Sequence, residues 1–134
     1  MRIVIDSNVW ISALVFGGKP RQVLERCVQS GIQIALSEEI ITEVRRNIRR
    51  KFAHFLPDFE SLLIALDGHI ERVGLGSITI SVSRDPDDNH VIETAAISNA
   101  DYIVSGDKDL LVLQRYETIR MVTPGEFIAE QTSL

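Results

Sequence analysis

The chain has 134 residues, of which 45% are hydrophobic and 25% are charged, and its only cysteine is Cys27. These values are typical of one globular domain, and they exclude a disordered chain, an internal disulfide and a cysteine-based zinc cluster. The longest uncharged apolar run, Val9–Gly18, is too short to cross a bilayer, and Met1–Ile5 lacks the length of a signal peptide. We therefore expect a cytoplasmic protein in which residues 1–134 form a single domain.

The charges are unevenly distributed. There are 14 basic and 19 acidic residues, for a formal net charge of −5. This balance argues against a general nucleic-acid-binding surface, because phosphate contacts favour positively charged domains. However, five of the seven residues Arg45–Lys51 are basic and three of the four residues Asp85–Asp88 are acidic. The sequence thus predicts a basic helix and an acidic turn on one small domain.

The predicted elements alternate between short strands and helices. In chain order they are a strand at Arg2–Ile5, helices at Val9–Phe16 and Arg21–Gln29, a strand at Ile32–Leu36, a helix capped by Ser37 that runs to about Lys51, a loop at Phe52–Asp58, a helix at Phe59–Leu66, short strands at His69–Val73 and Ser77–Val82, a helix from Asp85 to Asn99, a strand at Asp101–Ser105, a turn and helix at Gly106–Arg115, a strand at Ile119–Val122 and a terminal helix from Thr123. This alternation predicts an α/β fold whose central parallel sheet is covered by helices on both faces.

Two acidic residues follow predicted strands closely. Asp6 comes directly after Ile3–Ile5, and Asp107 follows Tyr102–Val104 by way of Ser105 and Gly106. In an open parallel sheet, ligands bind at the carboxyl ends of the strands. Taken alone, each residue is better explained by the preference of Asp for turns and helix N-caps.

The helix after Pro86 carries an acid on its apolar side. Asp88, Val91, Ile92 and Ala95 have the spacing of a single helix face. Capping by Asp85 explains an acid in the first turn, but it does not explain why the acid lies on the face that packs inward. A buried carboxylate is costly unless something cationic neutralises it.

Glu43 is a fourth candidate. It falls just beside the apolar arc of the 38–51 helix, at a position that could reach a pocket next to the core, with Arg46 and Arg50 next along. The alternative is a solvated Glu43–Arg46 salt bridge worth about 0.3 kcal/mol, which taken alone explains the residue better.

The four acids come from both halves of the chain, three of them lie at the ends where such a sheet makes its site, and together they point to a bound cation. Clustered carboxylates raise one another's pKa unless a divalent cation keeps them ionised. Oxygen ligands without Cys or His favour Mg²⁺ or Mn²⁺ over zinc. The chemistry that fits such a site is activation of a water against a phosphodiester.

These motifs together resemble the PIN domain. The resemblance runs from Ile3 to about Phe127 and rests on four motifs in order, namely the strand followed by Asp6-Ser7-Asn8, Glu43 on a mid-chain helix, Asp88 followed by Asn89–Ala95, and Ser105–Asp109. Two stretches, Asp85–His90 and Gly106–Leu111, look particularly like the PIN-family toxin components of bacterial toxin–antitoxin loci.

The resemblance implies a metal-dependent ribonuclease with a three-layer sandwich, in which a twisted parallel sheet lies between helices. Carried over position by position, it implies Asp6, Glu43, Asp88 and Asp107 as the acids that hold Mg²⁺ or Mn²⁺, with Ser7, Ser105 and Asp109 in supporting positions. Asp87 remains an alternative to Asp88, and Glu39 an alternative to Glu43.

The implied partners are an RNA substrate and an antitoxin protein, and family members are commonly homodimers; we expect no membrane contact. A PIN fold that serves only as a non-catalytic interaction domain or scaffold is the alternative of a different class. Arg46 and Arg50, on the side of Glu43, are expected to contact RNA phosphates, and the alternative is a basic helix face that is merely solvated.

Overall fold

The structure is a computed structural model that describes residues 1–83 and 85–132. Its strands are β1 (Arg2–Ile5), β2 (Gln33–Ser37), β3 (Ile70–Val73), β4 (Tyr102–Val104), β5 (Arg115–Tyr116) and β6 (Ile119–Val122). Its helices are α1 (Ser7–Val15), α2 (Gly18–Ser30), α3 (Glu38–Lys51), α4 (Leu56–Ala65), α5 (Pro86–Ser98), α6 (Lys108–Leu111) and α7 (Pro124–Thr132), with short 3₁₀ turns η1 (Ala53–Phe55) and η2 (Asp67–His69). Every helix within the described residues is too short or too polar to span a bilayer.

The sheet has the strand order β3-β2-β1-β4-β6-β5, and only the β5–β6 pair is antiparallel. From β1 the chain first moves outward to β2 and β3, and then returns to place β4 on the other side of β1. The connection therefore reverses direction between β1 and β4, which is where open parallel sheets bind ligands.

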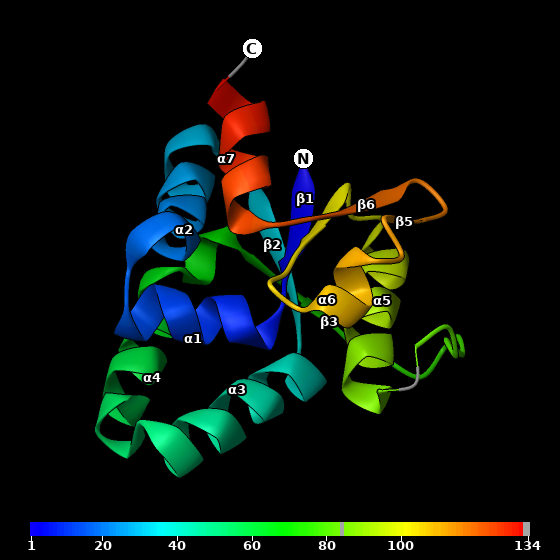
Figure 1. Cartoon of the computed structure of the whole chain (residues 1–134). Coiled ribbons are helices and arrows are strands. Elements are labelled where there is room, and N and C mark those ends of the chain that lie inside the picture. The colour runs from blue at the N-terminus through cyan, green and yellow to red at the C-terminus, as the bar shows by residue number, and fades with distance from the viewer. Residues whose placement is uncertain (84, 133–134) are drawn as a thin grey trace.

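Helices cover both faces of the sheet (Figure 1). Helices α1, α2, α4 and α7 lie on one side, α5 and α6 lie on the other, and α3 crosses the end of the sheet to contact both α1 and α5. The predicted three-layer α/β fold with a central, mostly parallel sheet is confirmed.

The core is built on the central strands. Ile3, Val4 and Ile5 are fully buried, because β1 is covered on both faces and needs no polar side. Trp10 and Cys27 are also buried, so the thiol belongs to the hydrophobic core, where burial raises its pKa to about 12. The central strand is thus rigidly packed up to the residue before Asp6.

Most predicted elements are present, with shifts at their ends. Helix α1 begins at Ser7 because Asp6 caps it, two residues before the predicted start. The predicted loop at Phe52–Asp58 is wrong in its second half: α4 begins at Leu56, and Pro57 fits its first turn, where no backbone N–H is required.

The predicted strand Ser77–Val82 is wrong. The segment has no regular structure, and its apolar residues Ile78 and Val82 are exposed, so its alternating pattern does not mark a buried face. Side chains of α5 hold its two flanks instead: the amide of Gly76 donates to Glu93 at 2.7 Å, and the amide of Ser83 donates to Asn89 at 2.9 Å. Strand β5 was not predicted: it begins at Arg115, the last residue of the predicted turn and helix Gly106–Arg115, and the helix itself ends at Leu111.

Candidate functional site

Three carboxylates meet at the carboxyl end of the sheet. Asp6 follows β1, Asp107 follows β4, and Asp88 lies in the first turn of α5. One oxygen from each of the three lies within 4.8 Å of the others. Asp6 is 3% exposed and Asp88 is 4% exposed, while Asp107 is half-buried. The structure thus brings together three of the four acids singled out from the sequence.

Hydrogen bonds hold the Asp6 carboxylate from several directions. As N-cap of α1, its Oδ1 accepts the amide of Ser7 at 2.8 Å. Its Oδ2 accepts the Ser105 hydroxyl at 2.7 Å and the Asn8 side-chain amide at 3.0 Å. Asp6 therefore both caps α1 and belongs to the carboxylate cluster, because the capping bond fixes its carboxylate there.

The same pattern recurs at Asp107. Its Oδ1 accepts the amide of Asp109 at 2.9 Å and caps α6, and its own amide donates to Ser105 Oγ at 2.9 Å. Ser105 is fully buried and bridges the two strand ends, since it contacts both Asp6 and Asp107. Asp109 contributes its backbone only; its side chain is exposed.

Asp88 is positioned by the segment that precedes its helix. The Ser83 hydroxyl donates to Asp88 Oδ2 at 3.1 Å. Asn89 holds Ser83 in place, because its Oδ1 accepts the Ser83 amide and its Nδ2 donates to the Ser83 carbonyl, both at 2.9 Å. Asp85 caps the helix by accepting the amide of Asp87 at 3.0 Å, as the sequence predicts.

Glu43 lies in the same pocket as the three aspartates. The pocket has a volume of about 340 Å³ and is lined by Asp6, Asp88, Asp107, Glu43 and ten further residues. Glu39, its alternative, is exposed and lies outside the pocket lining. Asp87, the alternative to Asp88, is also outside the lining; it faces Arg46 instead, whose Nη2 lies 3.2 Å from its Oδ2.

The cluster is electrostatically strained without a cation. Burial raises the pKa of Asp88 to about 7, and repulsion from Asp107 adds to the shift. Burial likewise raises the pKa of Glu43 to about 7 and raises the pKa of Asp6, although their hydrogen bonds act in the opposite direction. A cation among these groups would reverse the effect by favouring their ionised forms.

The donor set fits a hard divalent cation. Two oxygens bound to one Mg²⁺ at about 2.1 Å lie up to about 4.2 Å apart, so the carboxylates need only small side-chain movements to share an ion. No His or Cys lines the pocket within the described residues, and carboxylate oxygens favour Mg²⁺ or Mn²⁺.

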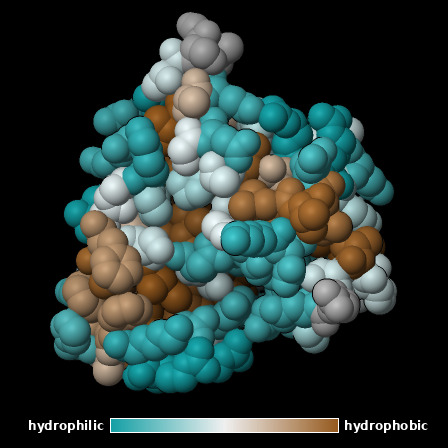
Figure 2. Space-filling view, viewed as in Figure 1, coloured by the Kyte–Doolittle hydropathy of each residue, from teal (hydrophilic) through white to brown (hydrophobic). Residues whose placement is uncertain are grey.

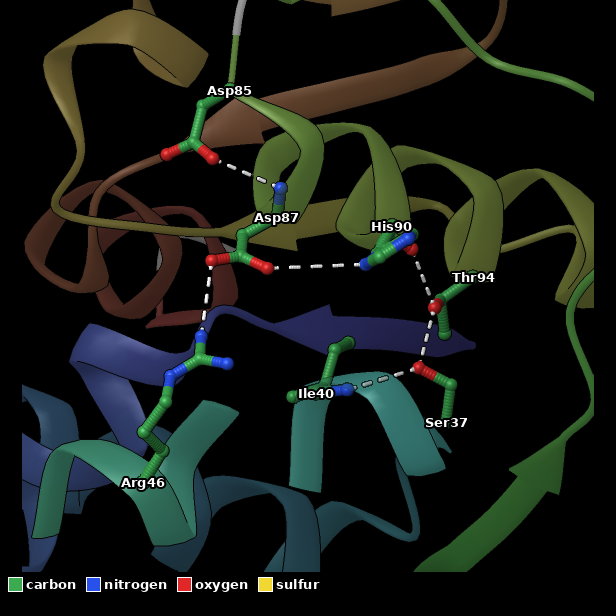
Figure 3. A network of polar contacts seen from close by, with 7 residues as sticks. All are labelled: Ser37, Ile40, Arg46, Asp85, Asp87, His90 and Thr94. Atoms are coloured by element: carbon green, nitrogen blue, oxygen red, sulfur yellow. Dashed lines mark hydrogen bonds and ion pairs between the residues drawn. The ribbon is translucent and has the colours of Figure 1, made fainter. Parts of the chain in front are cut away.

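A polar network fixes α3, which carries Glu43, against α5, which carries Asp88 (Figure 3). Arg46 and His90 both approach Asp87, at 3.2 Å and 4.0 Å. Further along, Thr94 donates to Ser37 Oγ at 2.9 Å, and Ser37 caps α3 by accepting the amide of Ile40. His90 belongs to this network at the surface rather than to the carboxylate cluster.

The basic residues of α3 differ in their surroundings. Arg50 and Lys51 line the pocket. Arg45, on another side of the helix, forms a bidentate ion pair with Glu60 at 2.6 and 3.0 Å. Arg46 lies next to the site but is bound to Asp87. Of the two expected phosphate contacts only Arg50 lines the pocket, where its Nη2 donates to Asn47 Oδ1 at 3.2 Å.

Several pocket residues were not found from the sequence, namely Lys51, Asn8, Phe16 and Phe52. Lys51 and Phe52 stand at the end of α3, and Phe16 at the end of α1, where side-chain direction depends on how the helices pack. Asn8 could have been found from the sequence, because it lies in the first turn of α1, next to Ser7 and the N-cap Asp6. The side-chain Oδ1 of Asn8 accepts the amide of Gly106 at 3.0 Å and links the two strand ends.

Comparisons with known proteins agree with this fold. The sequence model of the PIN-domain family matches residues 2–109. An uncharacterised protein of Methanocaldococcus jannaschii is 32% identical over 142 aligned positions, which cover 97% of this chain and 91% of the relative. Among solved structures, the fold is similar to a chain in VapBC2 from Rickettsia felis bound to a DNA fragment from its promoter, with a TM-score of 0.63, 14% identity, and coverage of 90% of this chain and 97% of that one.

Proposed function

This chain belongs to the PIN-domain family, and we propose that it is a metal-dependent ribonuclease that hydrolyses RNA phosphodiester bonds. The observation that carries the proposal is the convergence of Asp6, Asp88 and Asp107 at the point where the sheet connection reverses. Mg²⁺ or Mn²⁺ bound by these carboxylates would polarise a phosphoryl oxygen and activate a water.

The side chains of the pocket have different roles in this proposal. Asp6 is immobilised by three donors, so it is the fixed ligand of the set. Ser83 and Ser105 orient Asp88 and Asp6 by donating to one oxygen of each carboxylate. Glu43, half-buried beside Ser7, is placed to bind the ion or to orient the attacking water. In this proposal the aspartates bind the cation, and the serines fix the orientation of the aspartates.

The biological setting that fits is the toxin component of a toxin–antitoxin pair. The support comes from the two sequence stretches that resemble such toxins and from the fold shared with a chain of the VapBC2 complex. An antitoxin partner and a homodimeric state belong to the same proposal. The competing function is a non-catalytic PIN-fold scaffold, which the presence of Asp6, Glu43, Asp88 and Asp107 in one pocket disfavours.

The direct test is cleavage of labelled single-stranded RNA by the purified protein. We expect cleavage with Mg²⁺ or Mn²⁺ and none with EDTA, because without a cation the clustered carboxylates cannot polarise the phosphodiester. The EDTA-treated sample should recover on addition of Mn²⁺. Cleavage that is unaffected by EDTA would contradict the metal-dependent mechanism, and a protein that binds Mn²⁺ but leaves a varied set of RNAs intact would favour the scaffold.

The basic end of α3 predicts a difference in salt dependence. We expect Arg50→Ala with Lys51→Ala to weaken RNA binding for all sequences and to flatten the dependence of affinity on salt by roughly 0.7 per lost phosphate contact. The control is Arg45→Ala with Arg49→Ala on the same helix, which changes the net charge equally but removes no pocket residue. Affinity measured from 50 to 200 mM salt compares the pairs; equal slopes would show that this basic cluster is a solvated face.

A further inference from the structure

The pocket extends well beyond the carboxylates. It follows α1 and α3, which run side by side away from the end of the sheet (Figure 1). Pocket residues run from Ser7 to Phe16 along α1 and from Glu43 to Lys51 along α3. At 1.5 Å per helical residue these stretches are roughly 12 to 14 Å long, several times the spacing of about 3.4 Å between stacked nucleotides. The pocket is therefore longer than a single phosphate at the carboxylates requires.

The far end of the pocket carries an exposed aromatic ring. Phe16 is 74% exposed, and its ring meets that of Phe52 edge-on, with centroids 5.9 Å apart and planes at 88°. The carboxyl ends of two helices meet here, since Phe16 follows α1 and Phe52 follows α3. A T-shaped contact covers at most one face of a ring, so at least one face of the exposed Phe16 ring is left to stack.

The backbone around Phe16 is fixed, so the ring is presented on a rigid support. The amides of Phe16 and Gly17 both donate to the carbonyl of Ser12, at 2.9 and 3.0 Å. Gly17 has a φ of +78°, which other residues adopt only with strain, and Arg21 secures the same turn by donating to the carbonyl of Ala13 at 3.0 Å. Little conformational entropy is then lost when a ligand stacks on Phe16.

Positive charge lies next to the ring. Arg50 and Lys51 immediately precede Phe52 and line the same pocket, and neither forms an ion pair with an acidic side chain within residues 1–83 and 85–132. Figure 2 shows the hydrophilic surface of α3 directly below a hydrophobic area over the ends of α1 and α4. Arg50 donates to the neutral side chain of Asn47 at 3.2 Å, which leaves its charge uncompensated. Aromatic surface beside such cations is the combination that binds single-stranded nucleic acid, through base stacking and phosphate contacts.

We propose that Phe16, supported by Phe52, is a stacking platform for an unpaired nucleobase of the RNA whose backbone passes Arg50 and Lys51 to the carboxylates. This inference rests on the proposed function and names its substrate class as single-stranded RNA. Phe16 is a substrate-binding residue remote from the reacting phosphate. A base within a duplex has no free face to offer, so the platform selects unpaired over paired RNA.

The test is binding without metal, in EDTA, so that no cleavage occurs. Phe16→Leu keeps an apolar side chain but loses the ring, and we expect it to weaken binding of a labelled single-stranded RNA 12-mer by roughly 5- to 150-fold. Phe16→Trp should bind at least as well as the wild type. Ile64→Ala is the matched control, because Ile64 is an apolar side chain on α4 that is 78% exposed and lies outside the pocket lining.

Two further probes separate stacking from other effects. An abasic ribose-phosphate oligomer and a duplex of the same sequence should bind wild type and Phe16→Leu equally. The platform would be overturned if Phe16→Leu lost as much affinity for the abasic oligomer as for the single-stranded RNA. It would also be overturned if Phe16→Leu bound the single strand with wild-type affinity. Either result would leave Phe16 as a surface for a protein partner. Failure to bind any RNA would overturn it as well. Phe16-dependent binding in a protein that never cleaves would contradict only the proposed catalysis.

Discussion

Asp6→Asn is expected to reduce RNA cleavage by at least about a hundredfold while the protein stays folded. The substitution removes the charge of the most firmly held carboxylate but keeps an oxygen that can accept the Ser7 amide and cap α1. The new amide nitrogen cannot accept the hydrogen bonds that Ser105 and Asn8 donate to Oδ2, but the substitution also removes a buried charge that repels Asp107, so we expect the metal-free protein to stay folded. Cleavage rate and thermal unfolding in EDTA measure the two effects.

Asp109→Asn is the matched control for Asp6→Asn. It changes the net charge equally, but its side chain is exposed and outside the pocket lining, and only its backbone amide contacts Asp107. We expect cleavage close to that of the wild type. Wild-type cleavage by Asp6→Asn would remove Asp6 from the site, and equal losses in the two variants would point to a general effect of charge.

The metal-free protein is expected to lose stability as the pH rises from about 5 to 8. Asp88 and Glu43 have folded-state pKa values of about 7, above those of the unfolded chain, so the folded state binds more protons between the two values. The corresponding stability is fully present below the unfolded pKa of about 4 and is lost as the pH passes the folded pKa. Thermal unfolding in EDTA across this range measures the loss, which we expect to be several degrees.

Mn²⁺ should reverse this pH dependence. The ion binds the ionised carboxylates, so the increase in melting temperature on adding Mn²⁺ should be large at pH 8 and small at pH 5. In Asp6→Asn the increase should shrink at both pH values. An increase of the same size at pH 5 and pH 8 would place the ion somewhere other than among the buried carboxylates.

The sequence predicted the site best where an acidic residue had the spacing of a buried helix face or came soon after a predicted strand. The face Asp88, Val91, Ile92, Ala95 is buried as its spacing predicts. Asp6 and Asp107 lie at adjacent strand ends, because one follows a short apolar run directly and the other follows one after two residues. The choice of Asp88 over Asp87 followed from the same helix face, and the pocket lining agrees with it.

What could not be predicted depended on contacts between distant segments. The alternation of Ile78, Ile80 and Val82 resembles a strand, but Glu93 and Asn89 hold this stretch through side-chain hydrogen bonds that no local pattern reveals. Arg46 pairs with Asp87, 41 positions away, instead of with Glu43 on its own helix. The aromatic end of the pocket was missed because two helix ends, distant in sequence, create it by meeting.

The hydrogen bond between Ser105 and Asp6 joins residues 99 positions apart, and this separation bears on the time at which the site forms during synthesis. Parallel pairing over such a distance is a slow, late event in folding, because the intervening chain must be ordered first. A nascent chain that ends before β4 contains Asp6 and Glu43 but neither Ser105 nor Asp107. The carboxylate cluster therefore requires the chain as far as Asp107, and a product that ends before β4 would lack the proposed activity.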